Sequence, residues 1–197
     1  MTFLIGGTPR SGKTILKQIL LDRYHIPGIS TDLIRDALGK SMPGLGIKGD
    51  SKSDEEKSEI LWPHFREIIK QRGDYKDNLL IEGTNFLPKY LQEFKDKEDI
   101  RVCFLGYSEI DPIQKFNDIR KYPSHEGEWT DNMSDDELKK LVAEFVKISQ
   151  YFQYECKHCD IQYFDTSSNF HKIVEEAVAY LTNSLNLPTF ELWQLTN

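Results

Sequence analysis

Short apolar runs alternate with segments of helical periodicity along the chain, and this alternation predicts the order of the secondary structure. The apolar runs, which are typical of buried strands, cover 3–5, 29–30, 78–82, 100–106 and 161–164. Between them, apolar residues recur every three or four positions, as they do along one face of a helix. We expect helices over 12–24, 32–38, 53–72, 88–94, 111–122, 134–159 and 169–181. Five strands that alternate with helices predict a parallel sheet covered on both faces, a three-layer α/β/α sandwich.

Polar residues mark several of the expected helix starts. Thr31 is predicted to cap the second helix, and 53–56 and 134–137 have the Ser-x-x-Glu spacing of a capping box. Residues 39–53, between the second and third helices, are rich in glycine, proline and serine, so we expect a mobile loop there.

The turn from the first strand into the first helix carries the clearest chemical motif. Residues 7–14 read Gly-Thr-Pro-Arg-Ser-Gly-Lys-Thr, which is the Gly-x4-Gly-Lys-Thr spacing of a phosphate-binding P-loop. Glycines let such a backbone turn close to phosphate oxygens, and the loop amides and the following helix N-terminus attract anions. The lysine reaches the β- and γ-phosphates and the threonine hydroxyl can bind Mg²⁺. We therefore predict an ATP and Mg²⁺ site formed by Gly7, Thr8, Pro9, Arg10, Ser11, Gly12, Lys13 and Thr14, with Lys13 also catalytic.

Two carboxylates follow expected strands, and ligands of open parallel sheets bind at the carboxyl ends of strands. Asp32 follows the second strand, where it is either a substrate-binding and catalytic residue or only an acidic residue of a helix start. Arg35 lies one helical turn further on, and its guanidinium suits an acceptor that carries carboxylate or phosphate. Glu82 ends the third strand at the Walker-B position, which predicts a role in metal and substrate binding; alternatively it only begins the next loop.

The segment that follows the fourth strand has the properties of a closing lid. Residues 111–131 contain a helix that ends in a basic pair and then a polar loop. Arg120 is a candidate catalytic residue that neutralises charge on the transferring phosphoryl group, and a solvated surface arginine is the alternative. Cys156 and Cys159 flank a histidine, but without a second pair to complete four ligands we expect an ordinary helix end rather than a zinc site.

Length and charge narrow the class of protein. The 197 residues suit one domain, 1–197, with a substrate-binding region at about 32–75 and a lid at about 111–131. A net charge of −7 argues against nucleic acid or an anionic membrane as the main partner. The chain lacks an apolar run of about 20 residues and room for a signal peptide, so we expect a cytoplasmic protein, monomeric or homodimeric.

Three motifs together resemble the P-loop small-molecule kinases of the nucleoside-monophosphate-kinase-like superfamily, in its 2-phosphoglycerate kinase-like and adenylate-kinase-like branch. They are Gly-Gly-Thr-Pro-Arg-Ser-Gly-Lys-Thr at 6–14, Ser-Thr-Asp-Leu-Ile-Arg at 30–35 and Ile-Glu-Gly-Thr-Asn-Phe-Leu-Pro at 81–88. The resemblance covers roughly the first half of the chain. It implies the strand order 2-3-1-4-5, and similarity to chloramphenicol phosphotransferase, shikimate kinase and toxin-type kinases implies that Asp32 orients or deprotonates an acceptor hydroxyl.

The expected function is therefore transfer of the γ-phosphoryl group of Mg·ATP to a hydroxyl of a small, possibly anionic metabolite. A GTPase would carry an Asn-Lys-x-Asp motif after a strand, and the sequence has none. Two alternatives stay open: an ATP-binding regulatory module without a small acceptor, and a kinase that acts on RNA ends or another macromolecule. The acidic net charge weighs against the RNA alternative.

Overall fold

A five-stranded parallel sheet forms the centre of the molecule. The computed structural model describes residues 1–48, 52–122, 130–183 and 185. The strands are β1 (Thr2–Gly7), β2 (Gly28–Ser30), β3 (Leu79–Glu82), β4 (Ile100–Gly106) and β5 (Gln162–Asp165), and their order is β2-β3-β1-β4-β5. Every paired strand is parallel to its neighbour. The predicted sheet, including its strand order, is confirmed.

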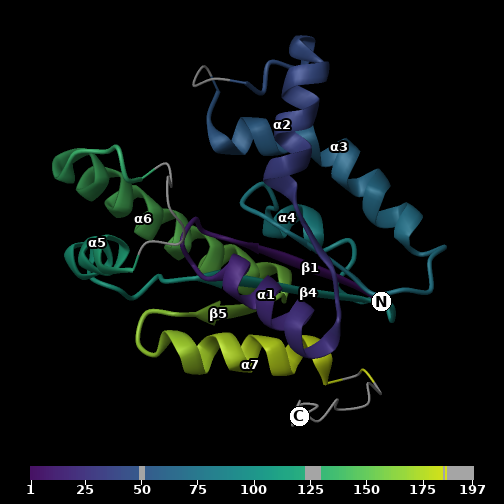
Figure 1. Cartoon of the computed structure of the whole chain (residues 1–197). Helices are drawn as coiled ribbons and strands as arrows, with labels where there is room; N and C mark the ends of the chain where they lie inside the picture. The colour runs from purple at the N-terminus through teal and green to yellow at the C-terminus, as the bar shows by residue number, and fades with distance from the viewer. Residues whose placement is uncertain (49–51, 123–129, 184, 186–197) are drawn as a thin grey trace, which may run out of the picture.

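Helices cover both faces of this sheet (Figure 1). α1 (Lys13–Tyr24) and α7 (Phe170–Thr182) lie on one face, while α4 (Pro88–Leu91) and α6 (Asp135–Cys159) lie on the other. α2 (Thr31–Ser41), the 3-10 turn η1 (Pro43–Leu45) and α3 (Asp54–Arg72) form a lobe beside β2 and β3, and α5 (Pro112–Lys121) packs against α6. This is the predicted three-layer arrangement.

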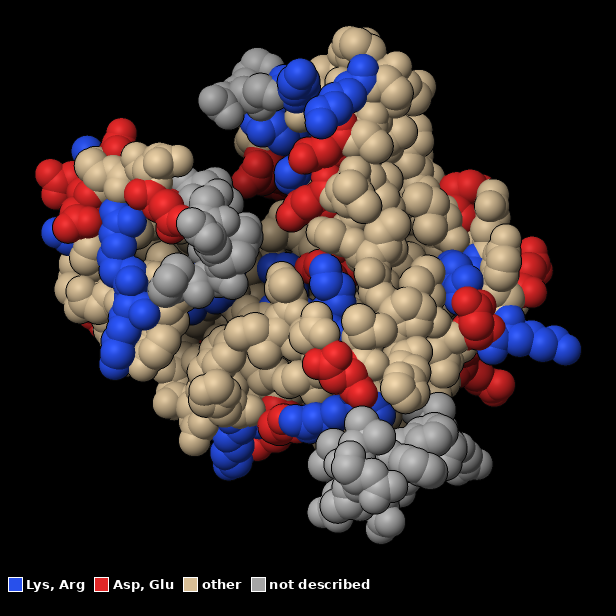
Figure 2. Space-filling model, in the orientation of Figure 1, with Lys and Arg blue, Asp and Glu red and all other residues tan. Residues whose placement is uncertain are grey.

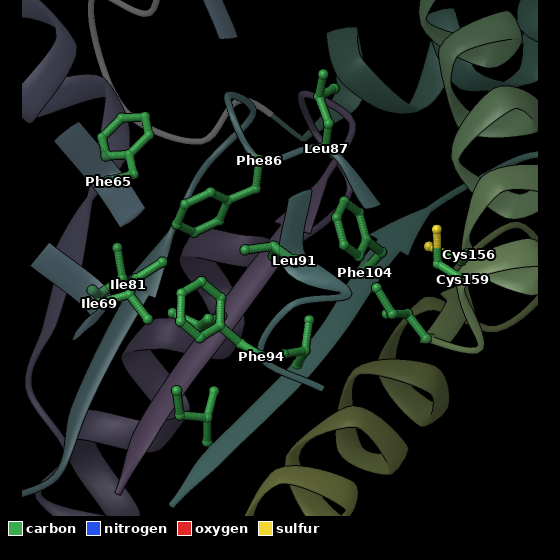
Figure 3. Packing of buried hydrophobic residues seen from close by; sticks show 14 of the residues in the cluster. Phe65, Ile69, Ile81, Phe86, Leu87, Leu91, Phe94, Phe104, Cys156 and Cys159 are labelled. Atoms are coloured by element: carbon green, nitrogen blue, oxygen red, sulfur yellow. The ribbon is translucent and has the colours of Figure 1, made fainter. Parts of the chain in front are cut away.

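Two buried clusters hold the layers together, because side chains of consecutive strand residues point to opposite faces. Phe3 and Ile5 of β1 pack with α1 and α7, whereas Leu4 packs with α3, α4 and α6. The second cluster contains the aromatic residues shown in Figure 3, and its members Cys156 and Cys159 lie in the last turn of α6. Their thiols are free and packed in this apolar core, which is the ordinary helix end that the sequence predicts.

The helix starts confirm both capping boxes and correct one predicted cap. Ser53 and Ser134 each exchange hydrogen bonds with the glutamate three residues on. The cap of α2, however, is Ser30 rather than Thr31: the Ser30 side chain accepts a hydrogen bond from the Asp32 amide, and Thr31 is already helical and buried. A serine in extended conformation at the end of β2 is a better cap geometrically than a threonine one residue later, because the capping residue must precede the first helical residue.

The predicted mobile loop at 39–53 is wrong in its first part. α2 continues to Ser41 and is followed by η1, so the second predicted helix is longer than 32–38. Residues 49–51 of that loop, 123–129 of the predicted lid and 186–197 lie outside the described residues. Among the described residues, no helix has an apolar stretch long enough to span a membrane.

Close approach of β3 to the start of α2 requires glycine at position 83. A Cβ atom on Gly83 would overlap the Thr31 hydroxyl and lie 2.8 Å from Thr31 Cβ. The Gly83 amide also donates to the Ile5 carbonyl of β1 at 3.0 Å, so the backbone cannot easily move away. The close packing of Gly83 against Thr31 holds the start of α2 beside the end of β3.

We predict that Gly83→Ala lowers the free energy of unfolding by about 3 kcal/mol, because the added methyl group has no room. The measurement is urea denaturation. Gly44→Ala is the matched control, since nothing lies within 4 Å of a Cβ built there, and it should leave stability within about 0.5 kcal/mol of the wild type. Equal stability of the two variants would contradict the close packing at Gly83.

Candidate functional site

The loop between β1 and α1 forms a cradle that only glycine can shape at its two ends. Gly7 and Gly12 have φ angles of +139° and +103°, a region that side chains rarely adopt. A Cβ on Gly7 would also overlap the Leu105 carbonyl oxygen of β4. The loop turns directly into the first residue of α1, so its amides and the helix N-terminus point to one place.

Lys13 and Ser11 make this cradle suitable for anions. The Lys13 ammonium is buried and donates to the carbonyl oxygens of Gly7 (3.0 Å) and Thr8 (2.7 Å). Burial lowers the pKa of Lys13 to about 8, although the nearby carboxylates of Glu82 and Asp32 oppose this shift. Among the described residues, the buried Ser11 hydroxyl has no hydrogen-bond partner, and an anion oxygen in the cradle would satisfy it. Thr14 is exposed at the second position of α1.

Two consecutive residues of the loop, Thr8 and Pro9, are held by contacts from outside it. The Thr8 hydroxyl lies 2.7 Å from the Ser149 hydroxyl of α6, which also accepts from the Tyr107 amide. The Tyr107 hydroxyl in turn donates to the Pro9 carbonyl at 2.6 Å. These buried contacts join the cradle to the segment that follows β4, so the loop is held in shape by distant parts of the chain.

Lys115 of α5 is a buried cation beside the cradle that the sequence analysis missed. Its ammonium donates to the Arg10 carbonyl at 3.0 Å and lies 3.9 Å from the centre of the Tyr107 ring. Burial lowers the pKa of Lys115 to about 8, with further lowering from the positive charges of Arg10 and Lys13. Arg10 itself donates to the Tyr122 carbonyl, so α5 contacts the loop tip at two points. No sequence motif signals Lys115, because a lysine on a helix is usually exposed.

Asp32 and Arg35 lie together near the end of β2, as their spacing predicts. Arg35 donates to Asp32 Oδ1 at 3.0 Å and bridges to Asp36, and the Thr84 hydroxyl lies 3.5 Å from the same Asp32 oxygen. Asp32 is half-exposed, and its charge acts on Lys13 of the cradle. The side chain of Arg35 is thus occupied in holding Asp32.

A pocket with a positive lining adjoins Arg35. It has a volume of about 170 Å³ and is lined by Arg35, Asp36, Gly39, Lys40, Ile47 and Lys48. Three of these residues are cationic and one is anionic, in a chain whose net charge is −7. Figure 2 shows the molecule hollowed between the lobe of α2 and the main body, with charged residues of both signs around the hollow.

Glu82 is a buried carboxylate at the end of β3, and its partner is a residue that the sequence analysis did not single out. The Lys17 ammonium of α1 donates to Glu82 Oε1 at 3.0 Å. Within the described part of the chain, no group of three or more His, Cys, Asp or Glu side chains is arranged to hold a metal. A hydroxyl at Thr14 and a carboxylate at Glu82 are oxygen donors of the kind that Mg²⁺ prefers, but they suit a metal that arrives with phosphate ligands of its own.

Arg120 lies in the last turn of α5 with its guanidinium fully engaged. It donates to the carbonyls of Thr130 (3.1 Å) and Met133 (2.6 Å) and to the Asp135 carboxylate (3.2 Å). These contacts tie the start of α6 to α5, and the predicted action of Arg120 on a phosphoryl group stays a prediction.

The chain is similar to kinases in both sequence and structure, although no protein-family model matches it. An adenylate kinase from Photorhabdus laumondii subsp. laumondii is 33% identical over 87 residues, which are 42% of this chain and 40% of that protein. The chain therefore matches less than half the length of this curated relative.

Solved structures extend the similarity over almost the whole chain. A shikimate kinase from Bacteroides thetaiotaomicron superposes with a TM-score of 0.54 at 17% identity and covers 95% of this chain and 99% of that one. A sugar kinase from a Janibacter species gives 0.55 at 15% identity, covering 93% and 95% of the two chains. A gluconokinase from Sinorhizobium meliloti gives 0.52 at 15% identity, covering 92% and 91%. At these identities the similarity shows the fold alone, and it confirms the predicted three-layer fold with a P-loop and the strand order 2-3-1-4-5.

The buried state of Lys115 predicts a specific pH dependence of stability. Its pKa of about 8 lies below the ordinary value of 10.5, so between these values the unfolded chain retains a proton that the folded protein has released. The free energy of unfolding should therefore rise with pH across this window, by about 3 kcal/mol from Lys115 alone. In Lys115→Met, the free energy of unfolding measured by urea denaturation should rise less steeply with pH. The part of the rise that comes from Lys13 should remain. Lys172→Met, which removes an exposed lysine of α7, should retain the wild-type slope, and an unchanged slope in Lys115→Met would contradict this account.

Proposed function

We propose that this chain is an ATP-dependent phosphotransferase that moves the γ-phosphoryl group of Mg·ATP to a hydroxyl of a small metabolite. The observation that carries the proposal is the convergence of three elements at the carboxyl edge of the sheet. The P-loop presents Lys13, β3 ends in Glu82, and β2 leads to Asp32, and both carboxylates act electrostatically on Lys13. The kinase names of the relatives support the same activity.

The cradle formed by residues 7–14 would hold the triphosphate. Its amides and the Lys13 ammonium supply positive charge where negative charge develops during transfer, and most of the catalysis in such reactions comes from positioning and charge neutralisation. Lys13 now donates to two loop carbonyls, and a bound phosphate would offer its ammonium stronger, charged acceptors. Thr14 and Glu82 would hold Mg²⁺, which would supply positive charge to neutralise the phosphates.

Asp32 would accept the proton of the acceptor hydroxyl or orient its oxygen. Asp32 lies at the start of α2, two residues after Ser30, which pairs with Glu82 in the sheet, and this position supports the proposed role of its carboxylate. The ion pair with Arg35 and the nearby Thr84 hydroxyl fix the orientation of this carboxylate. We therefore assign Arg35 a positioning role towards Asp32 in addition to its predicted role in acceptor binding.

We further propose that the acceptor molecule is anionic. The cationic pocket beside Arg35 is also lined by Lys40, Lys48 and the apolar side chain of Ile47. A carboxylate or phosphate of the acceptor would lie between these lysines while its hydroxyl faces Asp32. In this proposal the predicted substrate-binding region, about 32–75, would correspond to the lobe of α2 and α3 in a single kinase domain.

The predicted lid, about 111–131, would supply further positive charge from α5. Arg120 would have to leave the carbonyls of Thr130 and Met133 to reach a phosphoryl group, whereas Lys115 already lies at the cradle. We propose that Lys115 acts on the phosphates and that Arg120 holds the lid segment to α6.

Release of ADP from Mg·ATP should increase with an acceptor of the correct class. The panel contains hydroxy acids, sugar acids, sugars, phosphorylated acids and nucleoside monophosphates. Lys13→Ala should lower the stimulated rate by about 10² to 10³, and Asp32→Asn by about 10² or more. Asp22→Asn, an exposed residue of α1, should behave as the wild type. If no acceptor raises ADP release while ATP binds, the regulatory module becomes the better interpretation.

Preference for an anionic acceptor is tested separately with pairs such as D-gluconate and D-glucose. We expect Lys40→Gln combined with Lys48→Gln to raise KM for the charged member about tenfold with little change in kcat, because uniform binding is lost. The control pair Lys147→Gln and Lys172→Gln removes two exposed lysines far from the pocket. An equal effect on the neutral acceptor would contradict the anion assignment.

A further inference from the structure

The carboxylate at the end of β3 is already neutralised by the protein itself. Glu82 is 4% exposed, and the Lys17 ammonium lies 3.0 Å from its Oε1 atom. A carboxylate this deeply buried is costly without a cation or several hydrogen-bond donors. The contact is therefore a required part of the unliganded site and differs from an incidental surface ion pair.

The fold provides a dedicated place for the Lys17 side chain. Lys17 lies one helical turn after Lys13, so both lysines project from the same face of α1. A Cβ on Gly28 of β2 would lie 2.8 Å from Lys17 Cγ and Cδ, which shows that the lysine stem runs directly over this glycine. Gly28 and Ser30 are two positions apart on β2, and Ser30 pairs with Glu82 in the sheet. The stem thus follows β2 toward the strand ends and presents its ammonium to Glu82.

Glu82 is also the residue that the proposed function assigns to the metal. A divalent cation bound to this carboxylate would lie close to the Lys17 ammonium, which is 3.0 Å from Oε1, and the two cations would repel each other. Lys17 is about one-quarter exposed at its side chain, so its ammonium has a path into solvent.

We propose that Lys17 is a positioning residue that occupies Glu82 in the metal-free protein and competes with the divalent metal for this carboxylate. This inference rests on the proposed nucleotide and metal site. Lys17 keeps the buried carboxylate oriented before metal arrives, and metal loading would displace its ammonium from Glu82 toward solvent. The lysine thereby lowers the affinity for metal and keeps the empty site stable.

The test measures metal binding rather than turnover. Mn²⁺ replaces Mg²⁺ as the probe, and free Mn²⁺ is followed by electron paramagnetic resonance in the presence of saturating non-hydrolysable ATP analogue. Lys17→Met and Lys17→Gln should bind Mn²⁺ at least about tenfold more tightly than the wild type, because the competing charge is gone. Lys17→Arg, which retains a cation, should stay close to the wild type. Lys147→Met, which removes a lysine from an exposed ion pair of α6, is the matched control.

A double-mutant cycle ties the effect to Glu82. Glu82→Gln should weaken Mn²⁺ binding, and Lys17→Met should give no gain in that background. In a metal chelator without nucleotide, the melting temperature of Lys17→Met should lie several degrees below that of the wild type. Saturating Mn²⁺ with the ATP analogue should raise the melting temperature of Lys17→Met by more than it raises that of the Lys147→Met control.

Three results would overturn the inference. Unchanged or weaker Mn²⁺ binding in Lys17→Met and Lys17→Gln would show that the ion pair is structural only. An equal gain in the Glu82→Gln background would place the effect elsewhere. Insensitivity of Mn²⁺ binding to Glu82→Gln would mean that this carboxylate is no metal ligand. If both substitutions prevent folding, Gly28→Ala displaces the lysine stem and should give the same tightening. Because no step depends on an acceptor, the inference and the proposed phosphotransfer can fail independently.

Discussion

The loop that leads from β1 into α1 passes closer to β4 than any side chain would allow, and the arrangement of the site follows from this contact. Gly7 lies against the Leu105 carbonyl with a positive φ, and this turn brings the loop amides, Lys13 and the start of α1 to one point. The same principle acts between the neighbouring strands, where Gly83 lets Thr31 approach. Close backbone contacts at the carboxyl edge therefore bring Lys13, Glu82 and Asp32 within electrostatic range of one another.

The second constraint is that buried or partly buried charges at the site need partners, and here three lysine side chains are held by hydrogen bonds. Lys13, Lys17 and Lys115 approach the cradle from α1 and α5, and each is held by a carbonyl or a carboxylate. Burial depresses the pKa of Lys13 and Lys115, which is expected where positive charge is concentrated before an anionic ligand neutralises it. In the proposed phosphate site, Lys13 and Lys115 are therefore already in place and donate only to neutral carbonyl oxygens, whereas Lys17 is held by the Glu82 carboxylate.

Local sequence signals predicted much of this arrangement, and the misses have physical reasons. Residue spacing is sufficient to predict features that depend on residues close in sequence: the strands, the P-loop, both capping boxes and the proximity of Asp32 and Arg35. The strand order is predicted only by the resemblance to known kinases. The sequence predicts Thr31 as the cap because it precedes Asp32, an acidic residue of the first helical turn, whereas Ser30 has the extended conformation that a cap needs. Lys17, Lys115 and Ser149 acquire their roles only when distant segments pack together, and no local pattern distinguishes them from exposed residues.

We propose that this protein passes the γ-phosphoryl group to a hydroxyl of a small molecule and not to water. ³¹P nuclear magnetic resonance of Mg·ATP with the protein and pooled hydroxyl metabolites tests it most directly. The account predicts a new phosphomonoester signal that grows as the γ-phosphate signal of ATP declines, with little inorganic phosphate. Growth of inorganic phosphate alone, at a rate that no metabolite changes, would contradict the account.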